Sequence, residues 1–133
     1  MKSIVIKPGK FARVTDLDLS YHKLRDVVGG YIEMTYPFPD EEIAVISNEE
    51  AKLLDLAPNR AIRRADGTVI DIYCGPMVVV ALAPEGEYRD LTDQEINLIL
   101  QMWEQPESKT DWGGAKPNMT IRVCAGVRGG AFA

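Results

Sequence analysis

The segment 77–83, Met-Val-Val-Val-Ala-Leu-Ala, contains no polar side chain, and it restricts the possible folds more than any other part of the chain. Gly75-Pro76 precede it and Pro84 follows it, so residues that interrupt regular structure bound it on both sides. A short run rich in β-branched residues predicts a strand, and a strand that is apolar on both faces is expected at the centre of its sheet. The run is too short to span a membrane.

Several further strands are predicted around this central one. Residues 31–36 alternate, with Ile32, Met34 and Tyr36 on one side and polar residues on the other, which is typical of a half-buried strand. Short apolar or alternating runs predict the remaining strands, over residues 4–6, 43–46, 61–64, 68–73 and 119–124.

The segments on either side of Gly67 are expected to form a hairpin. A two-residue loop would place Ile62 opposite Asp71. A three-residue loop that ends at a left-handed Gly67 would instead put Ile62, Ile70 and Ile72 on one face. We favour the three-residue loop, because one apolar face is needed to fix the pairing.

The clearest helix is predicted from Thr92 to Trp103. Thr92 and Glu95 have the spacing of a capping box, in which each residue satisfies a free backbone amide of the other. The apolar residues from Ile96 to Trp103 recur at helical spacing and form one stripe. This stripe is expected to pack on the sheet.

Two shorter helices are predicted earlier in the chain. One covers residues 19–28 and ends at Gly29, which can adopt the left-handed conformation of a helix end. The other follows a second capping box, formed by Ser47 and Glu50, and carries Leu53-Leu54.

Together these elements predict an α+β fold with a single mixed or antiparallel sheet of about six short strands and two or three helices. We place one α+β domain over residues 1–104. Residues 105–117 are polar and rich in Gly and Pro, and we interpret them as a loop or linker. Residues 118–133 are interpreted as a C-terminal strand followed by a mobile tail.

The overall charge is acidic, with 20 Asp and Glu against 15 Lys and Arg. Proteins that follow nucleic-acid phosphates show the opposite balance, so we expect no nucleic-acid partner. We expect no membrane partner either, because the N-terminal apolar run is too short for a signal peptide. Cys74 and Cys124 lie in apolar segments and are interpreted as buried, reduced thiols, which favours the cytoplasm; their spacing also allows a bridge between them.

Catalytic and cofactor-binding patterns were not found in the sequence. The only histidine, His22, has no nucleophile in a recognisable motif beside it. The His and Cys spacing cannot build a zinc site, and no phosphate-binding glycine loop occurs. We therefore predict no catalytic residue, no metal and no cofactor.

Two small groups of residues are candidates for binding a ligand, and so is Trp112, which precedes the glycine pair 113–114 in a possible ligand flap. Tyr31 and Glu33 lie on the polar side of the 31–36 strand and could line a pocket, although an ordinary solvent-facing surface explains them as well. Asn59, Arg60 and Arg63 could form an anion site, because arginine suits carboxylate and phosphate groups. The competing interpretation of this second group is surface charge on an edge hairpin.

From Leu24 to about Trp103 the chain resembles an uncharacterised domain family of bacteriophages, plasmids and other mobile elements of bacteria. The similarity rests on segments that follow in order along the chain: 28–33 (VGGYIE), 48–53 (NEEAKL), 58–61 (PNRA), 66–67 (DG), 70–72 (IDI), Gly75 and the helix start at 91–92. Ala51 departs from the pattern, since the family often has glycine there. The resemblance implies a setting and no activity.

Three classes of function remain open, and we favour the first. It is a non-catalytic accessory protein that sequesters a small anionic, nucleotide-like host molecule, as an anti-defence sponge would, in a site formed between subunits of a homo-oligomer. The second is an inhibitor that binds a host defence protein through a sheet edge or the loop around Trp112, since exposed aromatic residues anchor interfaces. The third is an enzyme that uses scattered carboxylates.

Overall fold

The computed structural model describes residues 1–117. Within this range the chain forms eight strands and two helices, and the predicted α+β class is confirmed. In order they are β1 (Lys2–Ile6), β2 (Arg13–Asp16), α1 (Tyr21–Val28), β3 (Ile32–Thr35), β4 (Ile43–Asn48), β5 (Pro58–Arg63), β6 (Val69–Cys74), β7 (Met77–Leu82), β8 (Tyr88–Arg89) and α2 (Asp93–Trp103). The predicted strand over residues 119–124, the tail and Cys124 lie outside the described residues.

The predicted central strand is confirmed as β7. The main sheet has the order β2-β1-β7-β4-β3, β8 also pairs with β7, and every pair is antiparallel. Val79 lies between Ile4 of β1 and Val45 of β4, and all six residues of β7 are buried. A strand with neighbours on both sides and cover on both faces can be apolar throughout.

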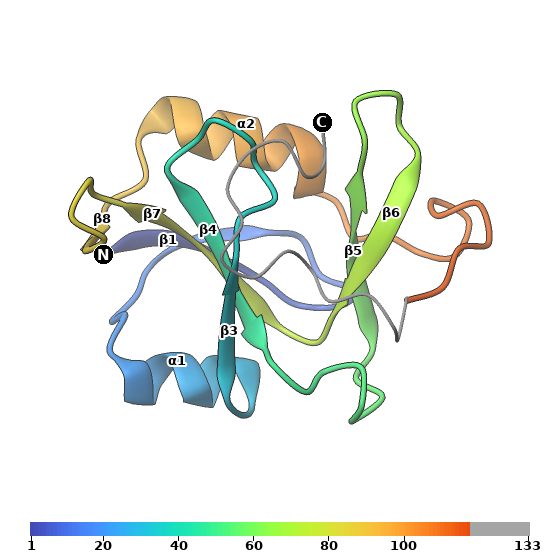
Figure 1. Ribbon diagram of the computed structural model, residues 1–133, viewed down its shortest axis with the longest axis horizontal. Helices are drawn as coiled ribbons and strands as arrows, with labels where there is room; N and C mark the ends of the chain where they lie inside the picture. Colours follow the sequence, from blue (N-terminus) through green and yellow to red (C-terminus); the bar gives the residue numbers. More distant parts are fainter. Residues whose placement is uncertain (118–133) are drawn as a thin grey trace.

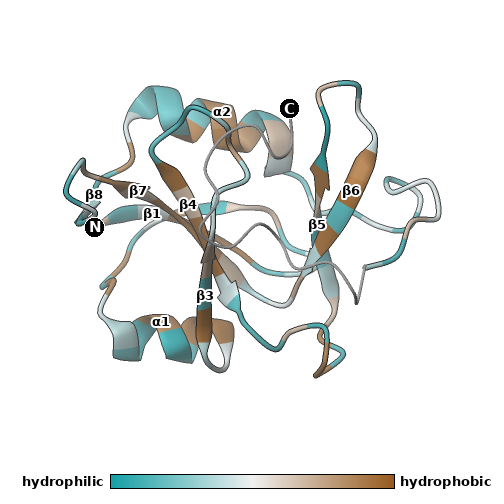
Figure 2. Cartoon of the chain, in the orientation of Figure 1, coloured by the Kyte–Doolittle hydropathy of each residue, from teal (hydrophilic) through white to brown (hydrophobic). Residues whose placement is uncertain are grey.

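The two helices cover opposite faces of this sheet (Figure 1). Ile99 and Trp103 of α2 pack in one core with Val79, whereas Leu24 and Val28 of α1 pack in the other core, on the opposite face of β7. The hydrophobic side of each helix faces the strands in Figure 2. The fold is therefore three layers, with α1 and α2 on the outside.

The ends of both helices follow the sequence prediction. The Thr92 hydroxyl accepts from the Glu95 amide at 3.1 Å, and the Glu95 carboxylate accepts from the Thr92 amide at 2.9 Å. At α1, Ser20 is the N-cap and Gly29 ends the helix with φ of +82°. These local signals needed no tertiary information.

The helix predicted after Ser47 is wrong. β4 continues to Asn48, so Ser47 pairs with Glu33 of β3 and cannot act as a helix cap. The Asn48 side chain instead accepts from the Glu50 amide at 2.8 Å and starts a series of turns. Leu53 and Leu54 are 74% and 56% exposed, so no apolar stripe is present to hold a helix against the protein.

The hairpin forms a separate two-stranded sheet, β5-β6, beside one end of the main sheet (Figure 1). Its loop has the predicted three residues, because the Arg64 amide bonds to the Thr68 carbonyl at 2.8 Å and Gly67 has φ of +90°. The register then shifts between Ile62 and Arg63, which brings Ile62 opposite Asp71.

This shift corrects the predicted face of the hairpin. Ile62 and Ile70 pack against the α2 core as expected, but Ile72 joins Ala61 and Trp112 in a different cluster. An extra residue in one strand reverses the alternation beyond it, so three isoleucines with even spacing do not stay on one side. The strands β2 and β8 were also missed, because β2 is mostly polar and exposed and β8 has only two residues.

Candidate anion-binding groove

A large cavity lies between the β1–β2 hairpin and α1. α1 rests against β3, β4 and β7, and it leaves the same face of β1 and β2 without a covering helix. The result is an open groove with a volume of about 910 Å³. It is lined by Val5, Lys7, Lys10, Phe11, Arg13, Thr15, Leu17, Lys23, Asp26 and Val27.

Strand register explains why these side chains meet. Val5 pairs with Arg13, and Val5 points away from the α2 core that contains its neighbours Ile4 and Ile6. Directly opposite residues of an antiparallel pair share a face, so Arg13 lies on the α1 side together with Val5. Thr15 follows two residues later and returns to this side.

The tight connection between β1 and β2 contributes the mouth of the groove. The Lys10 amide bonds to the Lys7 carbonyl at 3.1 Å, and Gly9 between them has φ of +72°, where a side chain would be strained. Phe11 follows this turn and is 60% exposed, although its ring lines the groove. An aromatic ring in this position offers a flat surface to a ligand.

The groove is cationic in an otherwise acidic protein. Four of the 15 lysines and arginines line it, with Asp26 as the single acidic lining residue, whereas the net charge of the chain is −5. Within residues 1–117 no ion pair or hydrogen bond involves the charged ends of these four side chains. Like charges gathered on one wall raise the local concentration of anions.

Asn59 and Arg60, two of the predicted ligand-binding residues, are fully buried. The Asn59 amide donates to the Ile6 and Gly75 carbonyls at 3.0 and 2.9 Å. Arg60 donates to the carbonyls of Trp103 and Lys10 at 3.0 and 2.7 Å. Both side chains therefore join β5 to the rest of the protein and do not face solvent.

Arg63 and Trp112 meet at a shared carboxylate. Glu107 accepts from the Trp112 indole at 2.8 Å and from Arg63 at 3.2 Å, and it also accepts from the Ala61 amide at 2.9 Å. Trp112 is only 7% exposed, so the expectation of an exposed aromatic anchor in this loop is wrong. The arrangement holds the segment after α2 against β5.

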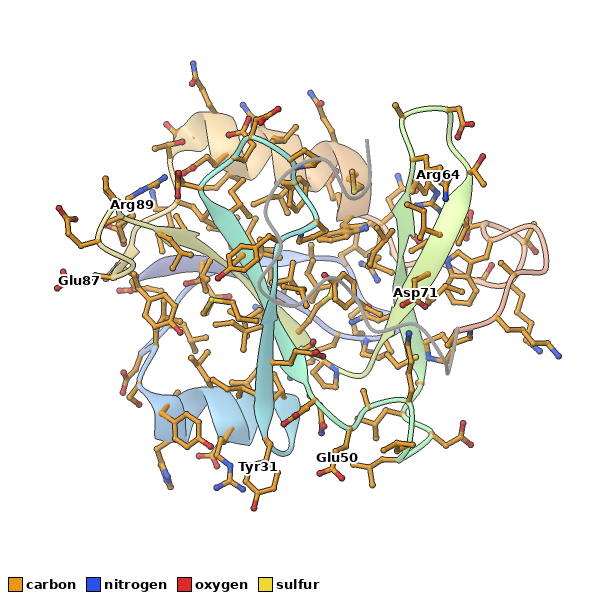
Figure 3. The ribbon with its side chains drawn as sticks, in the orientation of Figure 1. Tyr31, Glu50, Arg64, Asp71, Glu87 and Arg89 are labelled. Atoms are coloured by element: carbon orange, nitrogen blue, oxygen red, sulfur yellow. The ribbon has the colours of Figure 1, made fainter. Side chains whose placement is uncertain are left out.

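Tyr31 and Glu33 lie outside the groove and apart from the other predicted ligand-binding residues. Tyr31 is 55% exposed, and the guanidinium of Arg25 stands 4.7 Å from the centre of its ring. Glu33 is partly buried in β3 opposite Ser47. Figure 3 places Tyr31 beside the end of α1 and Arg64 near the tip of the β5–β6 hairpin, well apart from each other. Of the six predicted ligand-binding residues, Arg63 lines two cavities next to α2, and none of the six lines the groove.

Sequence reasoning missed the groove residues, although a signal was present. The first 15 residues contain Lys2, Lys7, Lys10 and Arg13 and no acidic residue, in a chain with an acidic excess. The spacing of three between the last three cations does not fit the strand period of two, so it did not mark a common face of a strand. The hairpin that brings them together includes β2, which had not been predicted.

Other reactive groups of the described residues are buried or dispersed. Burial raises the pKa of the Cys74 thiol to about 11, which keeps it protonated and unreactive at neutral pH. Within residues 1–117 no group of three or more His, Cys, Asp or Glu side chains is placed to hold a metal ion. Over the same range neither helix has the length and apolarity required to cross a membrane.

Comparison with protein families gave one match. A family model described as "Domain of unknown function (DUF3846)" matches residues 1–104. This range contains every strand and helix of the structure described above. No curated protein and no solved structure matches the chain.

Proposed function

Since the chain belongs to the DUF3846 family of domains of unknown function, which assigns no activity, we propose from the geometry that it binds and sequesters a small anionic, nucleotide-like molecule. The binding site in this proposal is the groove between β1–β2 and α1. The observation that carries the proposal is the gathering of Lys7, Lys10, Arg13 and Lys23 around an open cavity in a protein of negative net charge.

The lining combines two kinds of contact that a nucleotide-like ligand requires. The four cations suit phosphate oxygens, and arginine can bind them with two parallel hydrogen bonds. The exposed ring of Phe11 offers a stacking surface, and stacking of a base on an aromatic side chain contributes about 1–3 kcal/mol. A cavity of about 910 Å³ has the size of known small-molecule sites.

Sequestration without chemical change is the mode of action that we favour. Thr15 is the one hydroxyl and Asp26 the one carboxylate among the groove residues, and no histidine or cysteine lies with them, so the lining shows no recognisable pair of nucleophile and general base. We place the protein in bacteriophages and other mobile elements, where holding a host signalling nucleotide would counter a host defence. This setting comes from the family resemblance of the sequence and is part of the proposal.

Isothermal titration calorimetry with sodium tripolyphosphate and with ATP tests the proposed function. Both should bind the wild type at low ionic strength, with ATP binding more tightly because its base can stack on Phe11. The double variant Lys10→Gln/Arg13→Gln should weaken the binding of both ligands by up to roughly thirtyfold, since each of the two exposed charge pairs contributes up to about 1 kcal/mol. The double variant Arg64→Gln/Lys109→Gln has the same net charge and alters exposed cations outside the groove, so it is the matched control.

Two results would contradict the proposed function. One is the absence of binding of either ligand at millimolar concentration, and the other is an equal loss of affinity in the groove variant and its control. Recovery of intact ATP after denaturing the complex distinguishes sequestration from turnover.

A further inference from the structure

β2 is the outer strand of the main sheet and also the outer wall of the groove. The direction of its backbone groups follows from one hydrogen bond, in which the Leu17 amide donates to the Met1 carbonyl at 2.9 Å. Lys2 pairs with Asp16, so Leu17 and Met1 are the next pair and occupy a hydrogen-bonded position of the ladder. Bonded pairs alternate in an antiparallel ladder, which makes Thr15 and Arg13 the other bonded positions.

The backbone groups of Val14 and Asp16 consequently point away from β1. The edge is closed only at one end, where the Ala12 amide donates to the Glu104 carbonyl at 2.9 Å. Beyond that point, within residues 1–117, the backbone amides and carbonyls of Val14 and Asp16 form no further hydrogen bond. Val14 is also 48% exposed, which is unusual for a valine within a strand.

The outward amides and carbonyls of β2 can pair with the same groups of β2 in a second copy of the chain. We propose that β2 pairs with β2 of a second copy, antiparallel about a two-fold axis at Thr15, and that an anion held in the groove promotes this pairing. In that register Val14 and the partner's Asp16 exchange two backbone hydrogen bonds, and the symmetry repeats them. A register centred on Val14 is blocked, because Glu104 occupies the edge at Ala12, where the partner's Asp16 would have to lie.

The two-fold pairing would make one site of two grooves, and this step depends on the proposed function. Thr15 lines the groove, so Thr15 and the partner's Thr15 would meet at the axis on the groove side. A two-fold axis perpendicular to the sheet keeps the same face of both sheets on one side, so the two grooves would be continuous. A ligand with negative charge at both ends could then contact both copies.

Charge explains why an anion should promote the pairing. Arg13 lies two residues from Thr15 on the same face, so Arg13 and the partner's Arg13 would flank the axis. Four cationic side chains from each copy would then repel one another in the absence of ligand. The ladder is also only three residues long, so we expect the free protein to be monomeric at micromolar concentration and to dimerise with a polyanion.

Analytical ultracentrifugation at about 50 μM protein, with and without sodium tripolyphosphate, tests this inference. Val14→Pro removes an outward amide without disturbing the bonds to β1, and an edge position accepts proline. Val14→Thr keeps the amide and is the matched control. Val14→Glu keeps the backbone and faces the partner's Asp16, so it tests the same contact if the proline variant does not fold.

Tripolyphosphate should convert the wild type and Val14→Thr to dimers. For Val14→Pro and Val14→Glu the dimerisation constant in tripolyphosphate should be at least roughly tenfold weaker, since two hydrogen bonds of about 1 kcal/mol each are lost or opposed. A wild type that stays monomeric once calorimetry shows a saturated groove would overturn the inference and leave the proposed function intact. Dimers that are insensitive to both disruptive variants would also overturn it. If tripolyphosphate binds none of the proteins, the proposed function fails and the anion-linked dimer fails with it.

Discussion

Arg60→Met should lower the free energy of unfolding by about 3–5 kcal/mol, a range typical for breaking a buried charged network. Arg60 has no exposed surface, and burial lowers the pKa of its guanidinium. Its hydrogen bonds join three separate parts of the protein: the end of α2 at Trp103, the turn after β1 at Lys10, and Asn59 beside it in β5.

The magnitude follows from what the substitution leaves behind. Methionine fills much of the same volume, but the carbonyls of Trp103 and Lys10 and the side-chain oxygen of Asn59 would lose their charged donor. Hydrogen bonds to charged groups contribute about 1.5–3 kcal/mol each, so the gross loss is roughly 4.5–9 kcal/mol. Relief from burying the guanidinium offsets several kcal/mol of this loss, which leaves the net value given above. Arg60→Lys keeps the charge but reaches fewer acceptors, so its loss should be smaller.

Urea unfolding followed by tryptophan fluorescence measures this effect. Arg64→Met is the control, because Arg64 is exposed near the hairpin tip and its replacement should change stability by less than about 0.5 kcal/mol. A stability loss below about 1 kcal/mol would refute the structural role of Arg60.

Three further predictions concern single sites. The hydrogen bonds from Arg89 lower the pKa of Glu95 in the folded protein. This carboxylate therefore stabilises the fold at pH values above its unfolded pKa of about 4.3, and the stabilisation is lost as the pH falls through the folded pKa. Glu95→Gln should therefore flatten the acid limb of stability in urea titrations from pH 6 to about pH 2, and an unchanged limb would count against this account. Cys74, whose pKa is raised to about 11, should resist iodoacetamide at pH 8 in the folded protein and react with it in urea. Peptide mapping by mass spectrometry measures this labelling, and equal labelling rates in the two conditions would contradict the burial of Cys74. Gly75→Ala should lower the free energy of unfolding by about 1–3 kcal/mol, because φ is +78° and the new methyl would lie 2.8 Å from Leu56 Cδ1. If calorimetry gives the variant the same melting temperature as the wild type, this strain is excluded.

The local elements of this fold could be predicted because their causes lie within a few residues. The apolar run at 77–83 identified the central strand, and the Thr92–Glu95 box identified the start of α2. The Ser47–Glu50 spacing resembled the same box, yet it predicted a helix that does not form. At Thr92 the chain leaves a strand before the cap, whereas Ser47 is held in the ladder with β3. Partners from a distant strand decided between two equally good local signals.

The candidate site shows even more clearly which features follow from the sequence and which need the tertiary structure. The sequence by itself determined that this chain is an α+β protein with a buried central strand, and that cations precede any acid at its N-terminus. Only the tertiary structure decided that Arg60 is buried and that Lys7, Lys10 and Arg13 share a groove with Lys23 of α1. Residue type fixes what a side chain can bind, but the register of β1 with β2 and the position of α1 fix which side chains meet, and both depend on contacts between distant segments.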